Sequence, residues 1–430
     1  MKLTPLEPWI ANKIEHTDLT QYQLRKLNET LQLTATKSRF YRRHLANISI
    51  ELASLDDLAR LPFTIADDLR ADPLSFVCVS QDDIQRVVTL DDANFSLTTL
   101  TTSGTTGQLK RLYFTRDDQE LTIDFFRVGM STFTAPGDRV LILLPGETPG
   151  SVGDMLASAL TRLGAVPIKH GPVRDAAAAL EVIRREKINV LVGVPTHVLS
   201  LARYPNVPKL PLKSVLLSTD HVPQAIKLVV EERFACQVYN HYGMTEMGLG
   251  GGVDCEAQHG YHLREADLLF EIVDPDTGEP VPDGEYGEVV FTTLTRRGMP
   301  LIRYRTGDVS RFIPGPCPCG TRLKTLERIT HRWAGRVPIG ARYMTMADLD
   351  EALFAVDDVL NFTAALTHEN SHDCLQLNVK IANGGKLLPV VQSVAKAVPQ
   401  SRYFDVRVSS VTDIPPSMAK RTIIDRRNLA

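Results

Sequence analysis

The stretch RVLILLPGETPGSVGDMLASALTRLGAVPIK, residues Arg139 to Lys169, predicts a strand, a helix and a second strand in succession. An apolar run (RVLILLP) opens it, an amphipathic stretch (SVGDMLASALTRLG) follows, and a short apolar run (AVPI) closes it. Strands that are apolar throughout, separated by amphipathic helices, are typical of a parallel sheet whose faces are covered by helices. The stretch therefore predicts a layered α/β fold.

The same alternation continues toward the C-terminus. VRDAAAALEVIRREK and VPQAIKLVVEERF predict two further helices, and INVLVGVP, KSVLLSTD and ACQVYNHYG predict three further strands. Sheets of this kind bind ligands beyond the carboxyl ends of their strands, so we expect a site there. Polar clusters follow those ends: Pro145-Gly146, Pro195-Thr196-His197, Ser218-Thr219-Asp220 and Asn240-His241-Tyr242-Gly243.

The sequence changes character after about residue 260. LLFEIVDPDTGEPVPDGEYGEVVFTTL alternates strand-forming runs with turn residues and predicts a β-rich subdomain over about residues 263–330. The last 100 residues or so, with a helix expected at MADLDEALFAV, predict a small α+β domain. The expected organisation is an N-terminal domain of residues 1–330 and a small mobile C-terminal domain of residues 331–430. Residues 1–90 carry no functional signal beyond helical stretches such as LRKLNETLQL.

The charge of the chain argues for a small-molecule partner. Its 48 lysine and arginine residues against 51 aspartate and glutamate residues give a formal net charge of −3, without the basic stripe that nucleic-acid binders use. The N-terminus lacks the pattern of a secretory signal, and no apolar run approaches the roughly 20 residues needed to span a bilayer. We therefore expect a soluble cytoplasmic protein. Six cysteines in 430 residues are too few for a disulfide scaffold.

A loop rich in glycine and hydroxyl groups, TTSGTTGQLK, occupies residues 101–110. It is not a Walker loop, because Gly104 and Gly107 are only three positions apart and RLYFT after Lys110 predicts a strand rather than a helix. Several hydroxyl donors between glycines nevertheless suit phosphate oxygens at close approach. Taken alone, the loop fits a flexible surface hairpin equally well.

Three motifs in order resemble those of acyl-adenylate-forming enzymes: TTSGTTGQLK, NHYGMTE (240–246) and RYRTGD (303–308). The YGMTE form and the CPCG segment at residues 317–320 are most similar to the phenylacetate–CoA ligase family of enzymes that activate aryl acids. The resemblance implies ATP-dependent conversion of a small, aromatic carboxylic acid into an acyl-adenylate, with release of pyrophosphate. Transfer of the acyl group to CoA would follow.

The resemblance also implies roles for individual residues. Thr245 would contact the α-phosphate, Glu246 would ligate Mg²⁺, and Asp308 would accept hydrogen bonds from both ribose hydroxyls. Lys420 would bridge the carboxylate and the phosphate during adenylation. The remaining nucleotide contacts would come from Ser103, Gly104, Thr105, Thr106, Gly107 and Lys110 at the phosphates, from Ser218, Thr219, Asp220 and Tyr242 at the adenine, and from Asn240, His241, Gly243 and Met244 at the strand end.

The acid is expected in a pocket beside the adenylate. Its walls would come from His197, Leu144 to Gly150, Asn240, His241, and Met247 to Gly252. The glycine-rich run GLGGGVD is expected to leave room there.

The hinge that the family places between its two domains is altered in ITHRWAGRVPIG. Arg332 matches the family's arginine, but His331 stands where a glycine is usual and Trp333-Ala334 where an acid is usual. Rotation about this hinge serves the transfer step, so a carrier-protein thiol, an amine or a hydroxyl stays open as acceptor in place of CoA. A non-catalytic ATP-binding protein is a further alternative, which the presence of Glu246 and Lys420 argues against. A homodimer is open as well.

Four further residues predict a structural zinc site. Cys317 and Cys319 form a tight pair of thiols, and Cys255 precedes His262 by seven positions. Three cysteines and one histidine suit a closed tetrahedral zinc site, and family members with the CPCG segment resemble metal binders. His259 could replace His262. The alternative to a zinc site is that these four side chains are unrelated buried or surface residues.

Overall fold

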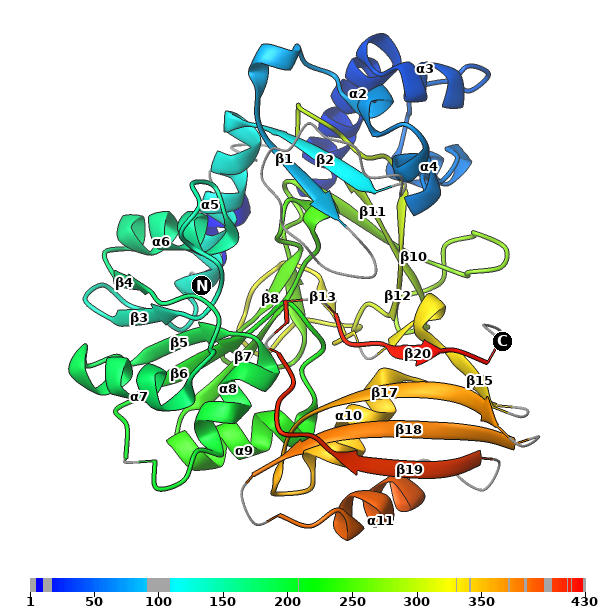
Figure 1. The fold of residues 1–430 in the computed structure, drawn as a ribbon. Coiled ribbons are helices and arrows are strands. Elements are labelled where there is room, and N and C mark those ends of the chain that lie inside the picture. The colour runs from blue at the N-terminus through cyan, green and yellow to red at the C-terminus, as the bar shows by residue number, and fades with distance from the viewer. Residues whose placement is uncertain are drawn as a thin grey trace. The chain divides into compact units, whose positions relative to one another are not determined.

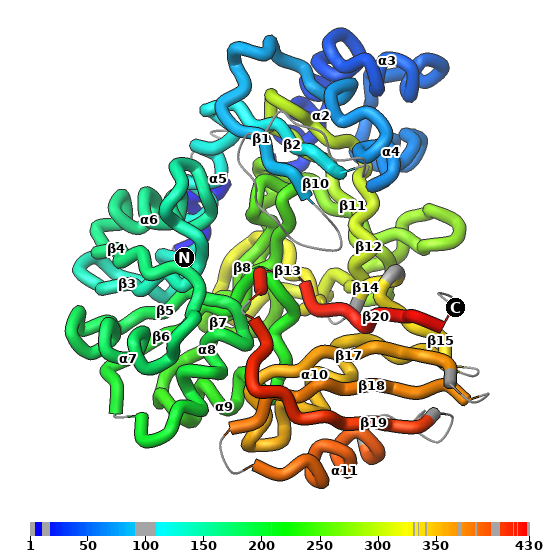
Figure 2. Tube along the Cα trace, viewed as in Figure 1, coloured from blue at the N-terminus to red at the C-terminus, as the bar shows by residue number. Residues whose placement is uncertain are grey.

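The computed structural model describes most of the chain. The described residues are 5–10, 18–90, 109–207, 209–329, 331–339, 342–369, 372–382, 385–397, 404–415, 417, 418 and 420–427. They form two compact units, and the path of the chain can be followed in Figure 1 and Figure 2. Unit 1 consists of Met1–Gly137, Gly146–Ala165 and His241–Ile329, and unit 2 of Asp138–Pro145, Val166–Asn240 and Thr330–Ala430. The predicted phosphate-loop residues Ser103, Gly104, Thr105, Thr106 and Gly107 lie outside the described residues.

A parallel sheet in unit 2 confirms the fold class expected from the sequence. Its strands are β3 (Arg139–Ile142), β4 (Val166–Lys169), β5 (Val190–Gly193), β6 (Ser214–Leu217) and β7 (Gln237–Tyr242). They lie in the order β4-β3-β5-β6-β7, and every neighbouring pair is parallel. All residues of β5 and β6 are buried, as their largely apolar sequences predict. The last two residues of β7, His241 and Tyr242, belong to unit 1.

Three helices of unit 2 alternate with these strands: α7 (Ala176–Arg185), α8 (Pro195–Ala202) and α9 (Gln224–Phe234). Helix α7 begins where the Asp175 carboxylate accepts hydrogen bonds from the first free backbone N–H groups of the helix. The polar cluster Pro195 to His197, which the sequence places after a strand end, forms the first turn of α8 and is not a loop. Proline suits that position, since its missing N–H would have no partner there.

The C-terminal part of unit 2 is an α+β arrangement, as expected. Strands β17 (Val359–Glu369), β18 (His372–Ile381), β19 (Phe404–Ser410) and β20 (Ile423–Asp425) lie in the order β19-β18-β17-β20, accompanied by helices α10 (Met346–Phe354) and α11 (Leu388–Ala397). Before them come β14 (His331–Arg332), η5 (Trp333–Gly335) and the hairpin of β15 (Val337–Ile339) and β16 (Arg342–Met344). A hydrophobic core shared by Leu143, Phe354 and Leu366 joins this part to the parallel sheet within unit 2. A domain boundary at residue 330 stays a prediction.

Unit 1 contains helices at its N-terminal side and antiparallel strands farther along. The helices are α2 (Leu19–Lys37), α3 (Arg39–His44), α4 (Ala66–Ala71), α5 (Arg116–Met130) and α6 (Val152–Leu163), with short 3₁₀ turns η1 (Leu55–Arg60), η2 (Pro73–Phe76), η3 (Gln81–Asp83) and η4 (Thr245–Met247). The strands are β1 (Ile84–Leu90), β2 (Lys110–Thr115), β8 (Gly252–Asp254), β9 (Tyr261–Leu263), β10 (Leu268–Val273), β11 (Gly287–Thr293), β12 (Tyr304–Ser310) and β13 (Thr325–Leu326). The pairs β1–β2, β10–β11 and β11–β12 are antiparallel. The predicted strand at RLYFT and the predicted β-strands within residues 263–330 are therefore confirmed, and the bounds of the subdomain stay a prediction.

The N-terminal segment braces this subdomain. Thr30 of α2 donates a hydrogen bond to the backbone oxygen of Leu294 at 3.0 Å, and Gln23 donates one to the backbone oxygen of Glu265 at 2.8 Å. The indole ring of Trp9 stacks on the Phe125 ring of α5 at 5.0 Å. In the described part of the chain, no helix has both the length and the hydropathy needed to cross a membrane.

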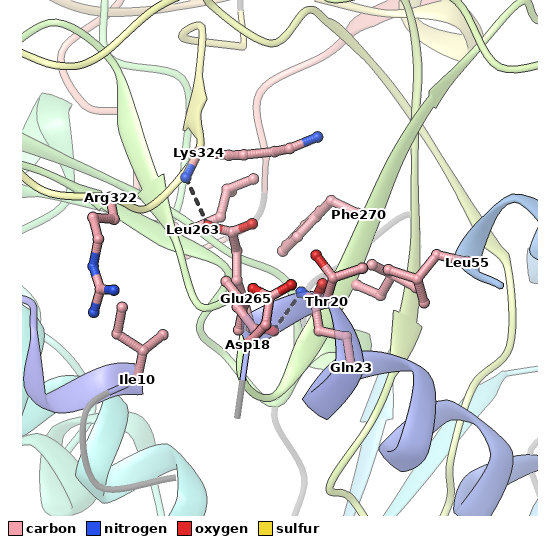
Figure 3. A pocket seen from close by; sticks show the side chains of 12 residues that line it. Ile10, Asp18, Thr20, Gln23, Leu55, Leu263, Glu265, Phe270, Arg322 and Lys324 are labelled. Atoms are coloured by element: carbon pink, nitrogen blue, oxygen red, sulfur yellow. Dashed lines mark hydrogen bonds between the residues drawn. The ribbon is translucent and has the colours of Figure 1, made fainter. Parts of the chain in front are cut away.

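A cavity of about 440 Å³ lies in unit 1 (Figure 3). Its lining residues are Ile10, Asp18, Leu19, Thr20, Gln23, Leu55, Leu263, Glu265, Leu269, Phe270, Arg322 and Lys324. Glu265 accepts a hydrogen bond from the backbone N–H of Lys324 at 2.7 Å. Burial raises the pKa of this carboxyl group to about 7. None of the lining residues is a predicted site residue.

Replacement of Glu265 by glutamine is expected to stabilise the protein above neutral pH. The pKa of Glu265 is higher in the folded protein than in the unfolded chain, so wild-type stability falls as pH rises through about 7. Glutamine keeps an oxygen for Lys324 and does not ionise. Calorimetry should give a melting temperature above wild type at pH 8, corresponding to about 2–3 kcal/mol, with no gain at pH 4.5. The exposed Glu256→Gln is the control, and an equal gain at both pH values would contradict the assignment.

Candidate active site

The NHYGMTE motif forms the end of β7 and the turn η4. A Cβ atom at Gly243 would lie 2.7 Å from the backbone oxygen of Leu249, so only glycine fits this turn. The turn buries Thr245 and Glu246, which are 4% and 2% exposed. A buried carboxylate needs a charged partner, and the structure supplies one.

Lys110, the first residue of β2, is that partner. Its ammonium group lies 3.0 Å from Oε1 of Glu246, and the hydroxyl of Tyr304 donates to the same oxygen at 3.3 Å. The backbone oxygen of Glu246 accepts a hydrogen bond from Arg296 at 2.8 Å. Two residues predicted from separate motifs are thus brought together as a buried ion pair.

Asp308 of the RYRTGD motif is positioned from the same strand end. The hydroxyl of Tyr242 donates to Oδ2 of Asp308 at 2.9 Å, and the Tyr242 ring stacks on that of Tyr261 at 5.6 Å. The backbone N–H of Asp308 donates to the hydroxyl of Thr306 at 3.0 Å. Tyr242 therefore connects the second and third motifs.

Two buried arginines near these residues were not predicted from the sequence. Arg296 and Arg86 are each 5% exposed, and among the described residues no partner accepts from Nε of either or from Nη2 of Arg296. The guanidinium of Arg296 lies 4.2 Å from the centre of the Phe114 ring. Arg86 stands opposite Phe114 in the β1–β2 ladder. Burial lowers the pKa of both groups, and their unmet donors suit an anion.

The prediction that GLGGGVD leaves room is wrong at Gly250 and Gly252, which pack against other described residues. A Cβ atom at Gly250 would lie 2.2 Å from the Phe125 ring, and one at Gly252 would lie 2.8 Å from the backbone oxygen of His262. These glycines allow close packing instead of leaving space. A hollow of about 10 Å³, enough for one water molecule, lies nearby. It is lined by Arg86, Val88, Phe114, Gln119, Thr122, Met155, Thr245 and Leu249.

The two predicted pocket histidines are neutral near pH 7. Burial lowers the pKa of His241 in unit 1 and of His197 in unit 2 to about 4 each. The His241 ring lies 5.6 Å from that of Phe125 and 6.4 Å from that of Phe126. Neutral, aromatic surroundings of this kind suit an aromatic ring better than a charged group.

In unit 2, the loop after β6 holds the predicted adenine residues. Ser218 is buried, and Thr219 has φ of +77°, a strained conformation for a β-branched residue that is characteristic of functional sites. The carboxylate of Asp220 accepts hydrogen bonds from two backbone N–H groups of the protein, those of His221 at 2.9 Å and Arg421 at 3.1 Å. The side chain of Lys420, the neighbour of Arg421, is exposed.

Asn240 and Arg332 complete the predicted residues of unit 2. Asn240 is buried at the end of the unit 2 segment of β7, and Arg332 is half-buried in β14. Farther along the hinge segment, the guanidinium of Arg336 lies 3.6 Å from the Trp333 ring centre. The hinge role of Arg332 stays a prediction.

The four predicted zinc ligands converge in unit 1. The ligand atoms of Cys255, His262, Cys317 and Cys319 all lie within 4.8 Å of one another. The sulfur atoms of Cys255 and Cys317 lie 3.7 Å apart, and the sulfur of Cys319 lies 3.4 Å from Nε2 of His262. Tetrahedral zinc with Zn–S bonds of about 2.3 Å would separate its sulfur ligands by about 3.8 Å. The side chains present therefore fit zinc.

The surroundings of the cluster also suit a metal. Nδ1 of His262 lies 3.3 Å from the hydroxyl of Thr325, the kind of second contact that orients a metal-binding imidazole. Burial lowers the pKa of His262 to about 4, which keeps it neutral, and raises the pKa of the Cys255 and Cys319 thiols. Buried thiolates would need a cation nearby.

Comparison with known proteins assigns the family. The model described as AMP-binding enzyme matches residues 21–294. This chain belongs to the AMP-binding enzyme family. A phenylacetate-coenzyme A ligase of Thermus thermophilus is 28% identical over 85% of this chain and 82% of its own length. A second, from Aromatoleum evansii, is 30% identical over 76% of this chain and 73% of its own length.

The fold of this AMP-binding enzyme is shared with a solved acid–CoA ligase. A 2-hydroxyisobutyryl-CoA ligase structure in the post-adenylation state has a TM-score of 0.79 at 22% identity, over 95% of this chain and 90% of that chain. The family predicted from three motifs and the layered α/β fold are therefore confirmed. The protein is an AMP-forming acid ligase, and this membership argues against the alternative of a non-catalytic ATP-binding protein.

Proposed function

We propose that this enzyme activates a small aromatic carboxylic acid with ATP and transfers the acyl group to CoA. The main support is the arrangement around Glu246: a buried carboxylate and Lys110 lie beside Thr245, and Tyr242 orients Asp308. A cationic group and a metal-binding carboxylate next to hydroxyl donors suit the meeting of two anions, a carboxylate and a triphosphate. The phenylacetate-coenzyme A ligase relatives support the aromatic acid and the CoA acceptor.

In the first step, an oxygen of the acid attacks the α-phosphorus of ATP, and the bond to the pyrophosphate oxygen breaks. Asp308 would hold the ribose hydroxyls, Thr245 would donate to the α-phosphate, and Glu246 would hold Mg²⁺. When bound, Mg²⁺ supplies positive charge for the leaving pyrophosphate. When Mg²⁺ binds to Glu246, Lys110 would move from Glu246 to the phosphates. Lys420 would bridge the carboxylate of the acid and the α-phosphate.

In the second step, the thiolate of CoA attacks the carbonyl carbon of the acyl-adenylate and AMP leaves. A thiol of a carrier protein, an amine or a hydroxyl would react at the same carbon. Because rotation about the hinge serves the transfer step, the altered hinge sequence around His331 and Trp333 leaves these acceptors as alternatives to CoA. A cytoplasmic location and a homodimer stay predictions.

The ring of the acid would lie against the wall formed by His241, Phe125 and Phe126. Zinc, bound by Cys255, His262, Cys317 and Cys319, would be structural, because four protein ligands leave no open position for a substrate.

Replacement of Tyr242 by phenylalanine is expected to weaken ATP binding with little effect on kcat. The variant loses one hydrogen bond to the Asp308 carboxylate, worth about 1.5–3 kcal/mol. Part of this loss should appear as weaker ribose binding, because Asp308 would be less well oriented toward the ribose hydroxyls. KM for ATP should rise by about 3- to 10-fold in steady-state assays. An unchanged KM for ATP would show that Asp308 does not need this hydrogen bond.

The decisive experiment is acid-dependent exchange of labelled pyrophosphate into ATP, without CoA, over substituted benzoic, phenylacetic and hydroxyanthranilic acids. Exchange with one of these acids would establish the substrate class. CoA-dependent release of AMP at the rate of pyrophosphate release would then identify CoA as acceptor. A protein that binds ATP and catalyses no exchange with any of these acids would refute the aromatic-acid proposal.

A further inference from the structure

The C-terminal tail of the chain is fixed at one residue next to Lys420. The guanidinium of Arg421 donates to Asp350 of α10 at 3.1 Å and to Asn361 of β17 at 2.5 Å. It also lies over two aromatic rings, 4.2 Å from the centre of Phe362 and 5.0 Å from that of Phe354. The side chain of Arg421 is therefore held by two elements of the C-terminal part of unit 2.

The backbone of the same residue is held elsewhere. The N–H group of Arg421 donates to Oδ2 of Asp220, in the loop after β6. The other oxygen of Asp220 accepts from the N–H group of His221, which fixes the orientation of the carboxylate. One residue thus joins the strand-end loop of the parallel sheet to α10 and β17.

Stability alone is a weak explanation for this arrangement. Asp350 is 2% exposed. The free-energy cost of removing the Asp350 and Arg421 charges from water offsets much of the stabilisation that their attraction provides. Burial raises the pKa of Asp350 to about 7, although Arg421 opposes that shift. Well-packed apolar residues would hold the tail at least as firmly. The bonds of Arg421 do provide a fixed position for the backbone beside an exposed lysine.

We propose that Arg421 is a positioning residue for Lys420, with Asp220 as its anchor on the nucleotide-binding sheet. This inference rests on the proposed role of Lys420 in adenylation. Because Arg421 is fixed at both its backbone and its side chain, the backbone at Lys420 is already restrained before the substrates bind. The entropy cost of positioning Lys420 for the reaction is therefore small. Lys420 is proposed to act in the first step alone, so Arg421 should matter for adenylation and not for transfer.

The test separates the two steps. Pyrophosphate exchange, with phenylacetate as the first acid, measures adenylation, and thioester formation from supplied phenylacetyl-adenylate and CoA measures transfer. Arg421→Ala should lower kcat of adenylation by about 30-fold, with KM for ATP and the transfer rate within about 3-fold of wild type. Arg421→Lys, which can still pair with Asp350, should recover most of this loss. Asp220→Ala should lower adenylation by about 10-fold.

Arg427→Ala is the matched control. Arg427 belongs to the same tail and pairs with Asp425 of β20 at 2.6 Å and with Asp373 of β18 at 2.7 Å. Its loss removes two ion pairs to partly exposed carboxylates and should leave adenylation within about 2-fold of wild type. Equal losses in both steps, or in the Arg421 and Arg427 variants alike, would show that Arg421 has only a structural role.

Two further measurements distinguish the possible failures. If Lys420→Ala keeps its adenylation rate, the proposed function of Lys420 fails; if it loses adenylation while Arg421→Ala does not, only the positioning role fails. Amide hydrogen exchange at Arg421 needs no substrate. It should be at least about 10-fold faster in Asp220→Ala than in wild type, and an unchanged rate would show that the Asp220 anchor does not hold.

Discussion

Replacement of Glu246 by glutamine is expected to lower the rate of acyl-adenylate formation by about 10²- to 10³-fold. The amide keeps the shape of the side chain and an oxygen for Lys110 and Tyr304, but it loses the charge that would hold Mg²⁺. The measurement is pyrophosphate exchange over a range of Mg²⁺ concentrations. The variant should need a higher Mg²⁺ concentration for its half-maximal rate, which a merely damaged fold would not produce.

Glu246→Asp and Glu256→Gln are the controls for this prediction. Aspartate retains the charge on a shorter side chain and should recover part of the Mg²⁺ response. Glu256 is exposed near the same segment, and its replacement should leave the rate unchanged. A Glu246→Gln enzyme with wild-type dependence on Mg²⁺ would mean that another group binds the metal.

Replacement of Cys317 by serine is expected to release zinc and to lower the melting temperature by about 10 °C. Elemental analysis of wild-type protein prepared without chelator should give one zinc ion per chain, because the four ligands form one tetrahedral set. Below the new melting temperature, adenylation should be little affected, since the metal would have a structural role.

Cys236→Ser is the control for zinc loss. Cys236 is half-buried in unit 2 and does not belong to the cluster, so its replacement should keep the zinc content of wild type. Wild-type protein without zinc, purified from zinc-supplemented medium, would refute the site.

The parallel sheet was predictable because burial on both faces dictates uninterrupted apolar strands, as in β5 and β6. Lys110 and Glu246 were predicted separately from two motifs. Their ion pair was not, because it depends on how β2 packs against the turn after β7. Sequence patterns identify residues, whereas pairing across 136 positions is a tertiary property.

Two failures have a common physical cause. GLGGGVD was interpreted as empty space, but the Phe125 ring of a distant helix occupies the volume beside Gly250. Arg86 and Arg296 were overlooked because arginine in a short sequence window usually indicates a solvated face, and only the packed structure shows both side chains buried. In each case the missing information was the identity of the neighbour from another part of the chain.

The ion pair of Lys110 and Glu246 also bears on how the enzyme would distinguish its substrate from simpler anions. Without nucleotide, the two opposite charges offset each other at 3.0 Å, so Lys110 itself offers little net attraction to phosphate or pyrophosphate alone. A metal ion bound by the Glu246 carboxylate would release the Lys110 ammonium group for the phosphates. The pair would therefore favour the metal–nucleotide complex over free metal ion or metal-free nucleotide, which makes the order in which metal and nucleotide arrive unimportant so long as they arrive together.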